Sequence, residues 1–411
     1  MSYTRRKPNP NVQQFVFTFR LYPKKKQHPV LWQNSGCKLV IWQYFLKRSN
    51  YLYETTGHRP TYDENSRHLT HVLKKDPEYA WLTQAESTVL QQTLKDLDNA
   101  FQRFFEDTSG FPNFKKFNRS RRSFRTMMSN QLDCKRSRIK IGKLGWFKVE
   151  GSWQDLADND KIKNITTKVD GGKWYCVVLV ERPKVESTHE HPYHILGNDL
   201  GVVNPVTSSY LNESGEYVEL PNNGREIADK IRKLEKLLAH NQRQFERMKI
   251  GSKNRKKQLA KINRIHYKIR MLRKEFREQF TNTTSKMFKH IAFEDLDLAN
   301  MTKSAKGTVE APGTNVAAKS GLNHGLLLMA LGALVTRQEQ KSKQRGGEVL
   351  LVNPRFTSQT CHKCNHKSKA NRKSQSEFVC GSCGYEENAD FNASCNVGIR
   401  GQKLLDKRLT A

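Results

Sequence analysis

The stretch "CGSCGYEENADFNAS", residues 380–394, holds two cysteines three positions apart and, seven positions after the second, Asp390. An equal pair lies upstream, so the full pattern is Cys361-x2-Cys364-x15-Cys380-x2-Cys383. This double Cys-x-x-Cys spacing is typical of a structural zinc site, in which four thiolates complete a tetrahedral shell. We therefore expect one structural zinc ion and do not expect Asp390 to be a zinc ligand. Disulfides are the alternative, and a reducing compartment disfavours them.

The charge balance points to a polyanionic partner. The 411 residues include 72 Lys and Arg against 40 Asp and Glu, which gives a formal net charge of +32. Nucleic acid is the commonest partner of so basic a protein. The longest apolar candidate, residues 325–335, is too short to span a membrane, and the first residues are polar. We expect a cytosolic or nucleoid protein of two to four domains with no membrane partner.

Alternating apolar and polar residues in the N-terminal half predict β-strands. Residues 14–22 are rich in aromatic and β-branched types, and several alternating stretches follow within residues 138–182. We expect these strands to form a split antiparallel β-barrel made of residues 1–45 and 127–190.

Between the two parts of this barrel, residues 46–126 predict an inserted helical region. Residues 39–57 have a helical pattern, and Thr83 with Glu86 predicts a capping box at the start of a second helix. Apolar residues follow that box at spacings of three and four, as expected for a buried helix face: Leu90, Leu94, Leu97, Phe101 and Phe104.

Basic and aromatic residues are interleaved in residues 111–126, which we expect to be a loop. The basic residues are candidates for phosphate contacts: Lys115, Lys116, Arg119, Arg121, Arg122 and Arg125. The aromatic residues are Phe114, Phe117 and Phe124, and we expect them to point inward rather than stack on bases.

From residue 195 onward, strand and helix patterns alternate, which predicts an α/β domain. Residues 195–211 predict two strands with a turn at Asn204-Pro205. A helical hairpin with its bend at residues 249–257 follows, and residues 290–296 and 347–354 predict further buried strands.

Three carboxylates in this half stand out. Asp199 lies in "GNDLG" and Glu294 ends "HIAFE", both on predicted buried strands, where an ionised acid is costly unless a cation neutralises it. Divalent metal ions would do so. Asp390 precedes an apparent helix, so it could instead be an N-cap, and Glu294 could be a surface charge at the end of a strand.

Taken together, these motifs resemble the TnpB family of transposon-encoded, RNA-guided DNA nucleases, which is related to compact type V CRISPR effectors. The similar elements are Gly-x-Asp-x-Gly around Asp199, Glu-Asp-Leu from Glu294, and the four cysteines followed by Asn-Ala-Asp-x-Asn-Ala around Asp390. "FRLYP" at residues 19–23 is similar to the N-terminal half of the family. The resemblance spans most of the chain.

The resemblance implies a fold and a site. It implies a multidomain α+β protein with a barrel "wedge" domain, a helical recognition region and a RuvC-like nuclease domain of RNase H fold. The nuclease domain would comprise residues 191–356 and 388–411, with a four-cysteine zinc ribbon at residues 357–387 inserted. Asp199, Glu294 and Asp390 would be the catalytic triad and would hold Mg²⁺, with two ions expected.

The implied activity is metal-dependent hydrolysis of DNA at a target matched by a guide RNA, next to a short adjacent motif. The implied partners are the guide RNA and double-stranded target DNA, with a monomer favoured. The alternatives are a nuclease-inactive RNA-guided repressor and a transposase or transposase-accessory protein. Two departures from the family pattern are Asn198, where the family usually has an apolar residue and where packing behind Asp199 would be weaker, and residues 303–325.

Overall fold

The computed structural model describes residues 12–116, 122–150, 160–183, 189–307 and 313–410. The chain forms a mixed α+β structure of two compact units, Met1–Lys184 and Val185–Ala411.

The first unit contains a seven-stranded sheet in the order β2-β6-β7-β1-β5-β4-β3, in which every pair of neighbouring strands is antiparallel. Its strands are β1 Val12–Tyr22, β2 Ser123–Thr126, β3 Gln131–Asp133, β4 Arg138–Lys140, β5 Trp146–Glu150, β6 Lys161–Asp170 and β7 Lys173–Pro183. The strand expected at residues 14–22 and those expected within residues 138–182 are confirmed. One face is buried because alternate side chains, such as Phe19, Leu21 and Val178, point into one core.

The expected closed barrel is wrong, because the edge strands β2 and β3 do not pair with each other in the described residues. Residues 127–130 join them directly, and the Asn130 side chain takes up polar groups at this junction. Its amide donates to the Thr126 carbonyl at 3.1 Å, and its oxygen accepts from the Gly142 amide at 2.9 Å. We expected residues 111–126 to be a loop, but the last four of them form β2. Phe124 and Thr126 of this strand are buried.

Three helices complete the first unit: α1 His28–Thr56, α2 Tyr62–His71 and α3 Ser87–Phe105, with short 3-10 turns at Lys25–Gln27, Leu73–Lys75 and Ala80–Gln84. α1 begins eleven residues before the predicted residue 39, with Pro29 in its first turn, and it ends at Gly57 in the left-handed conformation. The predicted domain boundary after residue 45 therefore lies inside a single helix. The helices share a second core, which includes Ile41, Phe45 and the expected apolar face of α3.

The capping box expected from Thr83 and Glu86 is wrong. Thr83 lies in a 3-10 turn and its hydroxyl donates to the Ala80 carbonyl at 2.7 Å, while Glu86 makes no side-chain cap at the start of α3. The Glu86 carboxylate instead accepts from the Lys143 amide at 2.9 Å. A tertiary partner has therefore displaced the local one.

The second unit contains a five-stranded sheet in the order β10-β9-β8-β11-β12. Its strands are β8 His191–Asp199, β9 Thr207–Leu211, β10 Tyr217–Glu219, β11 Phe288–Glu294 and β12 Glu348–Val352. β8, β11 and β12 are parallel, and β9 and β10 extend the sheet antiparallel. The strands predicted from residue 195 onward are confirmed.

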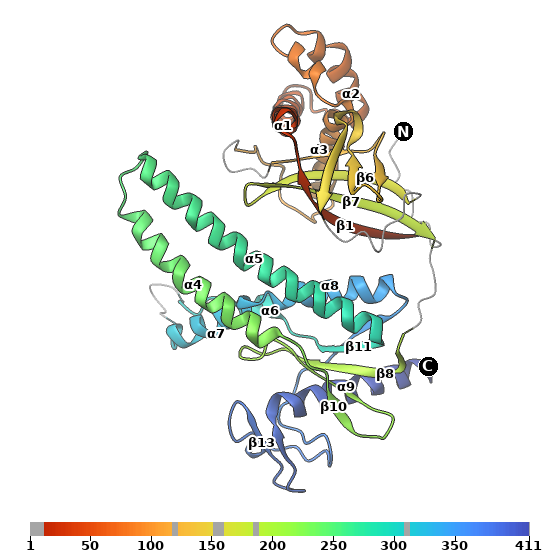
Figure 1. Ribbon diagram of the computed structural model, residues 1–411, viewed down its shortest axis with the longest axis vertical. Helices are drawn as coiled ribbons and strands as arrows, with labels where there is room; N and C mark the ends of the chain where they lie inside the picture. Colours follow the sequence, from red (N-terminus) through yellow and green to blue (C-terminus); the bar gives the residue numbers. More distant parts are fainter. Residues whose placement is uncertain (1–11, 117–121, 151–159, 184–188, 308–312, 411) are drawn as a thin grey trace. The chain divides into compact units, whose positions relative to one another are not determined.

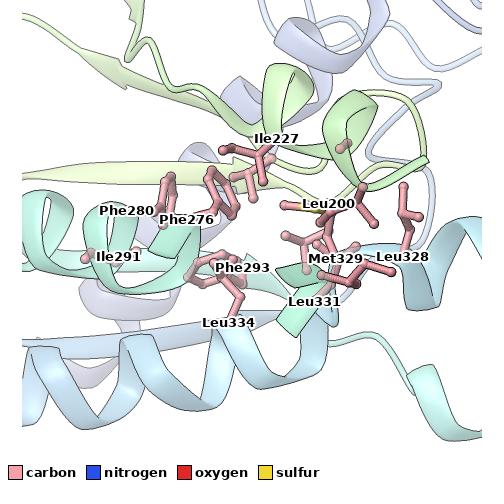
Figure 2. Close-up of a cluster of buried hydrophobic side chains, with 14 of the residues drawn as sticks. Leu200, Ile227, Phe276, Phe280, Ile291, Phe293, Leu328, Met329, Leu331 and Leu334 are labelled. Atoms are coloured by element: carbon pink, nitrogen blue, oxygen red, sulfur yellow. The ribbon is translucent and has the colours of Figure 1, made fainter. Parts of the chain in front are cut away.

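Helices cover both faces of this sheet. They are α4 Gly224–Glu246, α5 Lys253–Met287, α6 Leu298–Met301, α7 Val316–Leu328, α8 Leu331–Gln344 and α9 Ala389–Leu409. Strand alternation divides the core, because Leu196, Ile291 and Phe293 pack with α4, α5 and α8, whereas Ile195 and Ala292 pack with α9. Figure 2 shows the first of these clusters, in which Phe276 and Phe280 of α5 lie against Ile227 of α4. The predicted helical hairpin is α4–α5 (Figure 1).

Within the described ranges, one segment, Val316–Gln344, has the length and composition of a membrane-spanning helix. It is divided into α7 and α8 at Ala330, which has a φ of 54°. Leu331 and Leu334 of this segment are buried in the core beside α5.

Candidate functional site

Two of the three carboxylates lie side by side because β8 and β11 are parallel neighbours. Asn198 pairs with Phe293, so the next residue of each strand, Asp199 and Glu294, stands at the same carboxyl edge of the sheet. This edge is where open α/β sheets usually bind ligands. Asp390 is the second residue of α9, which packs against β8 and β9.

The electrostatics of the site show that the three carboxylates are close together. Burial, together with the neighbouring charges of Glu294 and Asp390, raises the pKa of Asp199 to about 8, against the opposing effect of Arg372. Burial also raises the pKa values of Glu294 and Asp390 above their ordinary range. Three acids in one desolvated place disfavour their own ionisation, and a multivalent cation would relieve that repulsion.

Three further residues hold these carboxylates, and the sequence did not single them out as site residues. The Thr357 hydroxyl donates to Glu294 Oε1 at 2.5 Å, and Arg372 Nη2 lies 3.9 Å from Asp390 Oδ1. A hydrogen bond from the Asn204 side chain lowers the pKa of Asp390, opposing its burial. Thr357 and Arg372 follow β12 in the chain, far from either strand acid, so no spacing in the sequence links them to the site.

The structure excludes the two alternative roles considered for the acids, an N-cap for Asp390 and a surface charge for Glu294. Asn388 is the N-cap of α9, because its side-chain oxygen accepts from the Asp390 amide at 2.9 Å and from the Phe391 amide at 3.3 Å. Asp390 is therefore not the cap. Glu294 is only 9% exposed, so it is not a surface charge at the end of a strand.

Asn198 does not leave a weak place behind Asp199. Its side chain is fully buried, and its amide donates to the Ala292 carbonyl at 3.0 Å and the Leu196 carbonyl at 3.2 Å. Its oxygen accepts from the Ser208 hydroxyl at 2.7 Å. This network ties β8 to β9 and β11, so the expected loss of packing is wrong.

The four cysteines form a compact cluster, with all sulfur atoms within 4.8 Å of one another. The Sγ atoms of Cys361 and Cys383 lie 3.7 Å apart, and those of Cys364 and Cys380 lie 3.5 Å apart. A tetrahedron of sulfurs about 2.3 Å from zinc has edges of about 3.8 Å, so the spacing is compatible with a zinc ribbon. Both separations are far longer than a disulfide bond of about 2.05 Å, so the disulfide alternative is wrong for these pairs.

Two tight turns present the cysteines. The Cys361 amide donates to the His366 carbonyl at 3.0 Å, and the Cys380 amide donates to the Tyr385 carbonyl at 2.8 Å. β13 Glu377–Val379 and β14 Glu386–Asn388 form the hairpin that carries the second turn.

α9 joins the cysteine cluster to the carboxylate edge. Asn392 lies two residues after Asp390, and its amide donates to the Thr360 carbonyl at 2.9 Å. Its oxygen accepts from the His362 amide at 3.1 Å. His362, one of the two residues between the first two cysteines, is thus hydrogen-bonded to the helix that carries the third acid.

The basic residues predicted to contact phosphates differ in their surroundings. The Lys115 amine lies 3.1 Å from the centre of the Trp42 ring, and burial together with the charge of Lys38 lowers its pKa to about 8. Arg125 Nη2 lies 3.4 Å from Asp96 Oδ1. These two side chains already have protein partners.

Of the other four basic residues predicted to contact phosphates, two lie within the described residues and two do not. Lys116 is exposed and Arg122 is partly buried. Arg119, Arg121 and Phe117 lie outside the described residues. Phe124 points inward as expected, but Phe114 is 53% exposed, so the inward orientation expected for it is wrong.

The fold and the site together define a class: a multidomain α+β protein that gathers three carboxylates at one sheet edge beside a four-cysteine cluster. A solved structure titled as a Cas12f1–sgRNA–target DNA complex has a similar fold, with a TM-score of 0.53, 15% sequence identity, and coverage of 94% of this chain and 99% of that chain. Residues 332–397 match the family described as "Cas12f1-like, TNB domain", and residues 175–305 match "Probable transposase".

Curated relatives narrow the class to a family. The chain is 36% identical over 391 residues to "Putative RNA-guided DNA endonuclease InsQ" of Escherichia coli (strain K12), covering 95% of this chain and 93% of that protein. It is 26% identical to a "Putative RNA-guided DNA endonuclease" of Streptomyces pristinaespiralis, over 93% of this chain and 88% of that protein. The chain belongs to the TnpB family, as its motifs implied.

Proposed function

We propose that this protein is an RNA-guided DNA endonuclease that hydrolyses phosphodiester bonds with divalent metal ions. The observation that carries the proposal is the meeting of Asp199, Glu294 and Asp390 at one edge of the sheet in a desolvated setting that raises the pKa of each. The relatives named as RNA-guided DNA endonucleases support the same reaction.

The donor chemistry fits magnesium. Carboxylate oxygens are ligands that Mg²⁺ prefers. Among the described residues, Arg372 is the only cationic side chain within 4 Å of a carboxylate oxygen of Asp199, Glu294 or Asp390. Asp199, Glu294 and Asp390 would hold two ions, which would supply an activated water and stabilise the leaving oxygen. Thr357 fixes one oxygen of Glu294, which pre-orients that carboxylate.

The cysteine cluster would hold one zinc ion in a structural role, because four thiolates leave no open coordination position. Through Asn392, the ordered cluster would keep the start of α9 and therefore Asp390 in place. Residues 191–356 and 388–411 would then form a RuvC-type nuclease domain with residues 357–387 as its zinc ribbon.

Sequence choice would come from the guide RNA. The net charge of +32 can hold a long polyanion, but contacts to phosphates carry no sequence information. Pairing between the RNA and the target strand supplies that information, while the protein reads a short adjacent motif. The basic residues of 111–126 would contribute phosphate contacts, most directly Lys116, whose side chain is exposed.

The test is cleavage of a plasmid library by protein that was expressed with its flanking DNA and purified with its RNA. We expect cutting at the site matched by the copurified RNA in the presence of Mg²⁺, and no cutting by the protein after the RNA is removed. Equal sequence-specific cutting without RNA would defeat the proposal. Matched binding without cutting would indicate a repressor, and joined products would indicate a transposase.

A further inference from the structure

Cationic residues dominate the outer half of the α4–α5 hairpin. Residues 247–274 hold twelve Lys and Arg and no Asp or Glu, and Glu246 and Glu275 border this segment. The bend that joins α4 to α5 lies at the end of the hairpin away from β8 and β11 (Figure 1). The outer half of the hairpin is therefore a basic projection of the second unit.

Four of these cations share one face of α5. Lys257, Lys261, Arg264 and Lys268 follow one another at spacings of four, three and four, and all four side chains are exposed. At 100° per residue they lie within an arc of about 60°, along about 16 Å of helix. We name these four residues the α5 stripe. The buried residues Ile262, Ile265 and Ile269 lie on a different face, against the hydrophobic core or α4.

The stripe differs from the inner half of the same hairpin, where cations have acidic partners. Lys230 pairs with Glu226 at 2.6 Å, and Arg232 pairs with Asp229 at 2.6 Å. In the part of the chain that the structure describes, no member of the α5 stripe has an ion-pair partner. Like charges at these spacings destabilise a helix, so the stripe costs stability unless an anion neutralises it.

The bend is held firmly enough to keep the stripe in one place. The Arg255 guanidinium donates to the Phe245 carbonyl at 2.9 Å and to the Met248 carbonyl at 2.6 Å, which caps the end of α4. The Gln258 amide donates to Asn241 Oδ1 at 2.9 Å between the two helices. The bend thus uses Arg255 for structure, while the side chains of the α5 stripe stay exposed.

We propose that the α5 stripe binds the phosphate backbone of the guide RNA. Consecutive members at four-residue spacing rise by about 6 Å along the helix, so a line of cations can follow a line of phosphates. A partner that stays bound through the working life of the protein would neutralise the stripe continuously, whereas a target DNA would do so only during each encounter. This inference rests on the proposed function, in which the protein carries an RNA.

The test compares two matched pairs of lysines in the full chain. Lys257→Gln with Lys261→Gln removes two exposed charges at four-residue spacing from the stripe. Lys403→Gln with Lys407→Gln removes two exposed charges at the same spacing from α9, where Asp406 lies beside them. Binding of the copurified RNA is measured against salt concentration for both variants, with thermal unfolding as the check on folding.

We expect the stripe variant to bind RNA roughly 10- to 30-fold more weakly near 0.1 M salt and to lower the slope of log K against log salt by about 1.4. The α9 variant should bind close to normally, and Lys257→Arg with Lys261→Arg should restore binding. Equal losses in both glutamine variants would overturn the proposal, because net charge alone would then explain them.

A second arm separates RNA from DNA. Matched DNA is added to complexes preassembled with RNA, and DNA binding is measured. Normal RNA binding with weakened DNA binding would overturn the assignment to RNA. Both arms measure binding and not cleavage, so the two proposals can fail separately. If the stripe variant binds RNA normally while wild-type complexes cut matched DNA, only the stripe proposal is refuted. If wild-type complexes never cut matched DNA, the proposed function is refuted.

Discussion

The cysteine cluster and the carboxylate site lie in the same unit but are built in opposite ways. The four cysteines fall within residues 361–383, and two local turns bring their sulfur atoms within 4.8 Å. The acids come from positions 199, 294 and 390, and only the pairing of β8 with β11 and the packing of α9 unite them. Local spacing is enough to specify the first site, whereas the second exists only when the sheet has formed.

The difference predicts different consequences when each region is damaged. A carboxylate at the open edge supports chemistry and little of the fold, since burial raises the pKa of each acid and so penalises its charged form. The cysteines support the structure around them, and through Asn392 they also support the position of Asp390. Removing an acid should therefore stop cleavage alone, and removing a cysteine should harm both folding and cleavage.

The largest effect is expected from the acids. Asp199→Ala, Glu294→Ala and Asp390→Ala should each lower Mg²⁺-dependent cleavage by about 10³-fold or more, because losing a metal-ligand carboxylate dismantles the site. Asp390→Asn should do the same. Because Asn388 caps α9, this substitution leaves the cap in place and removes only the carboxylate. Plasmid cleavage by the RNA complex measures the loss, and gel-shift assays should show matched DNA binding nearly unchanged.

Glu213→Ala is the control for the acid variants, because Glu213 is an exposed acid in the turn between β9 and β10. It should cut DNA at the wild-type rate. Wild-type cleavage by Asp390→Asn would show instead that this carboxylate is dispensable, and the three-acid site would fail.

The next largest effect is expected at the cysteines. Cys361→Ser or Cys380→Ser should remove the zinc ion and make residues 357–387 sensitive to proteolysis, because metal binding supplies folding free energy to such small modules. Cleavage should fall as well, since Asp390 loses its support. Elemental analysis measures zinc per chain, and Cys134→Ser, which lies outside the cluster, should keep a full zinc ion. Soluble, active protein without zinc would contradict this view.

The contrast between the two sites also explains what the sequence could predict. Strand alternation and the cysteine spacing are local signals, so β1, β8, β11 and the sulfur cluster follow from them. Thr357 and Arg372 reach the acids only through tertiary folding, and no pattern in the sequence marks them. The same limit explains Glu86, whose pattern fits a local cap but whose carboxylate binds the Lys143 amide.

A smaller effect is expected from the buried amide behind the acids. Asn198→Leu should destabilise the second unit by about 1–3 kcal/mol, because it leaves the Ser208 hydroxyl and the Ala292 carbonyl without their partner. Chemical denaturation measures this change. If Asn198 acts through Ser208, then Ser208→Ala should cost much less in the Asn198→Leu background than in the wild type. Additive losses would show that the two side chains act independently.

The smallest effect is expected in the metal-free protein and depends on pH. Burial holds the pKa of Asp199 at about 8, above its ordinary value of 3.8, so between these values the folded state keeps a proton that the unfolded state has released. The free energy of unfolding should therefore fall as pH rises from about 4 to about 8.

Asp199→Asn has no charge to bury, so in EDTA its melting temperature should exceed that of the wild type by a few degrees at pH 8 and by little at pH 5. Asp295→Asn, an exposed neighbour, should show no such difference. Added Mg²⁺ should stabilise the wild type more than Asp199→Asn at pH 8, because only the wild type offers the full carboxylate set. A melting temperature that Asp199→Asn leaves unchanged at every pH would show that this carboxylate is not under electrostatic stress, and the contrast between the two sites would lose its physical basis.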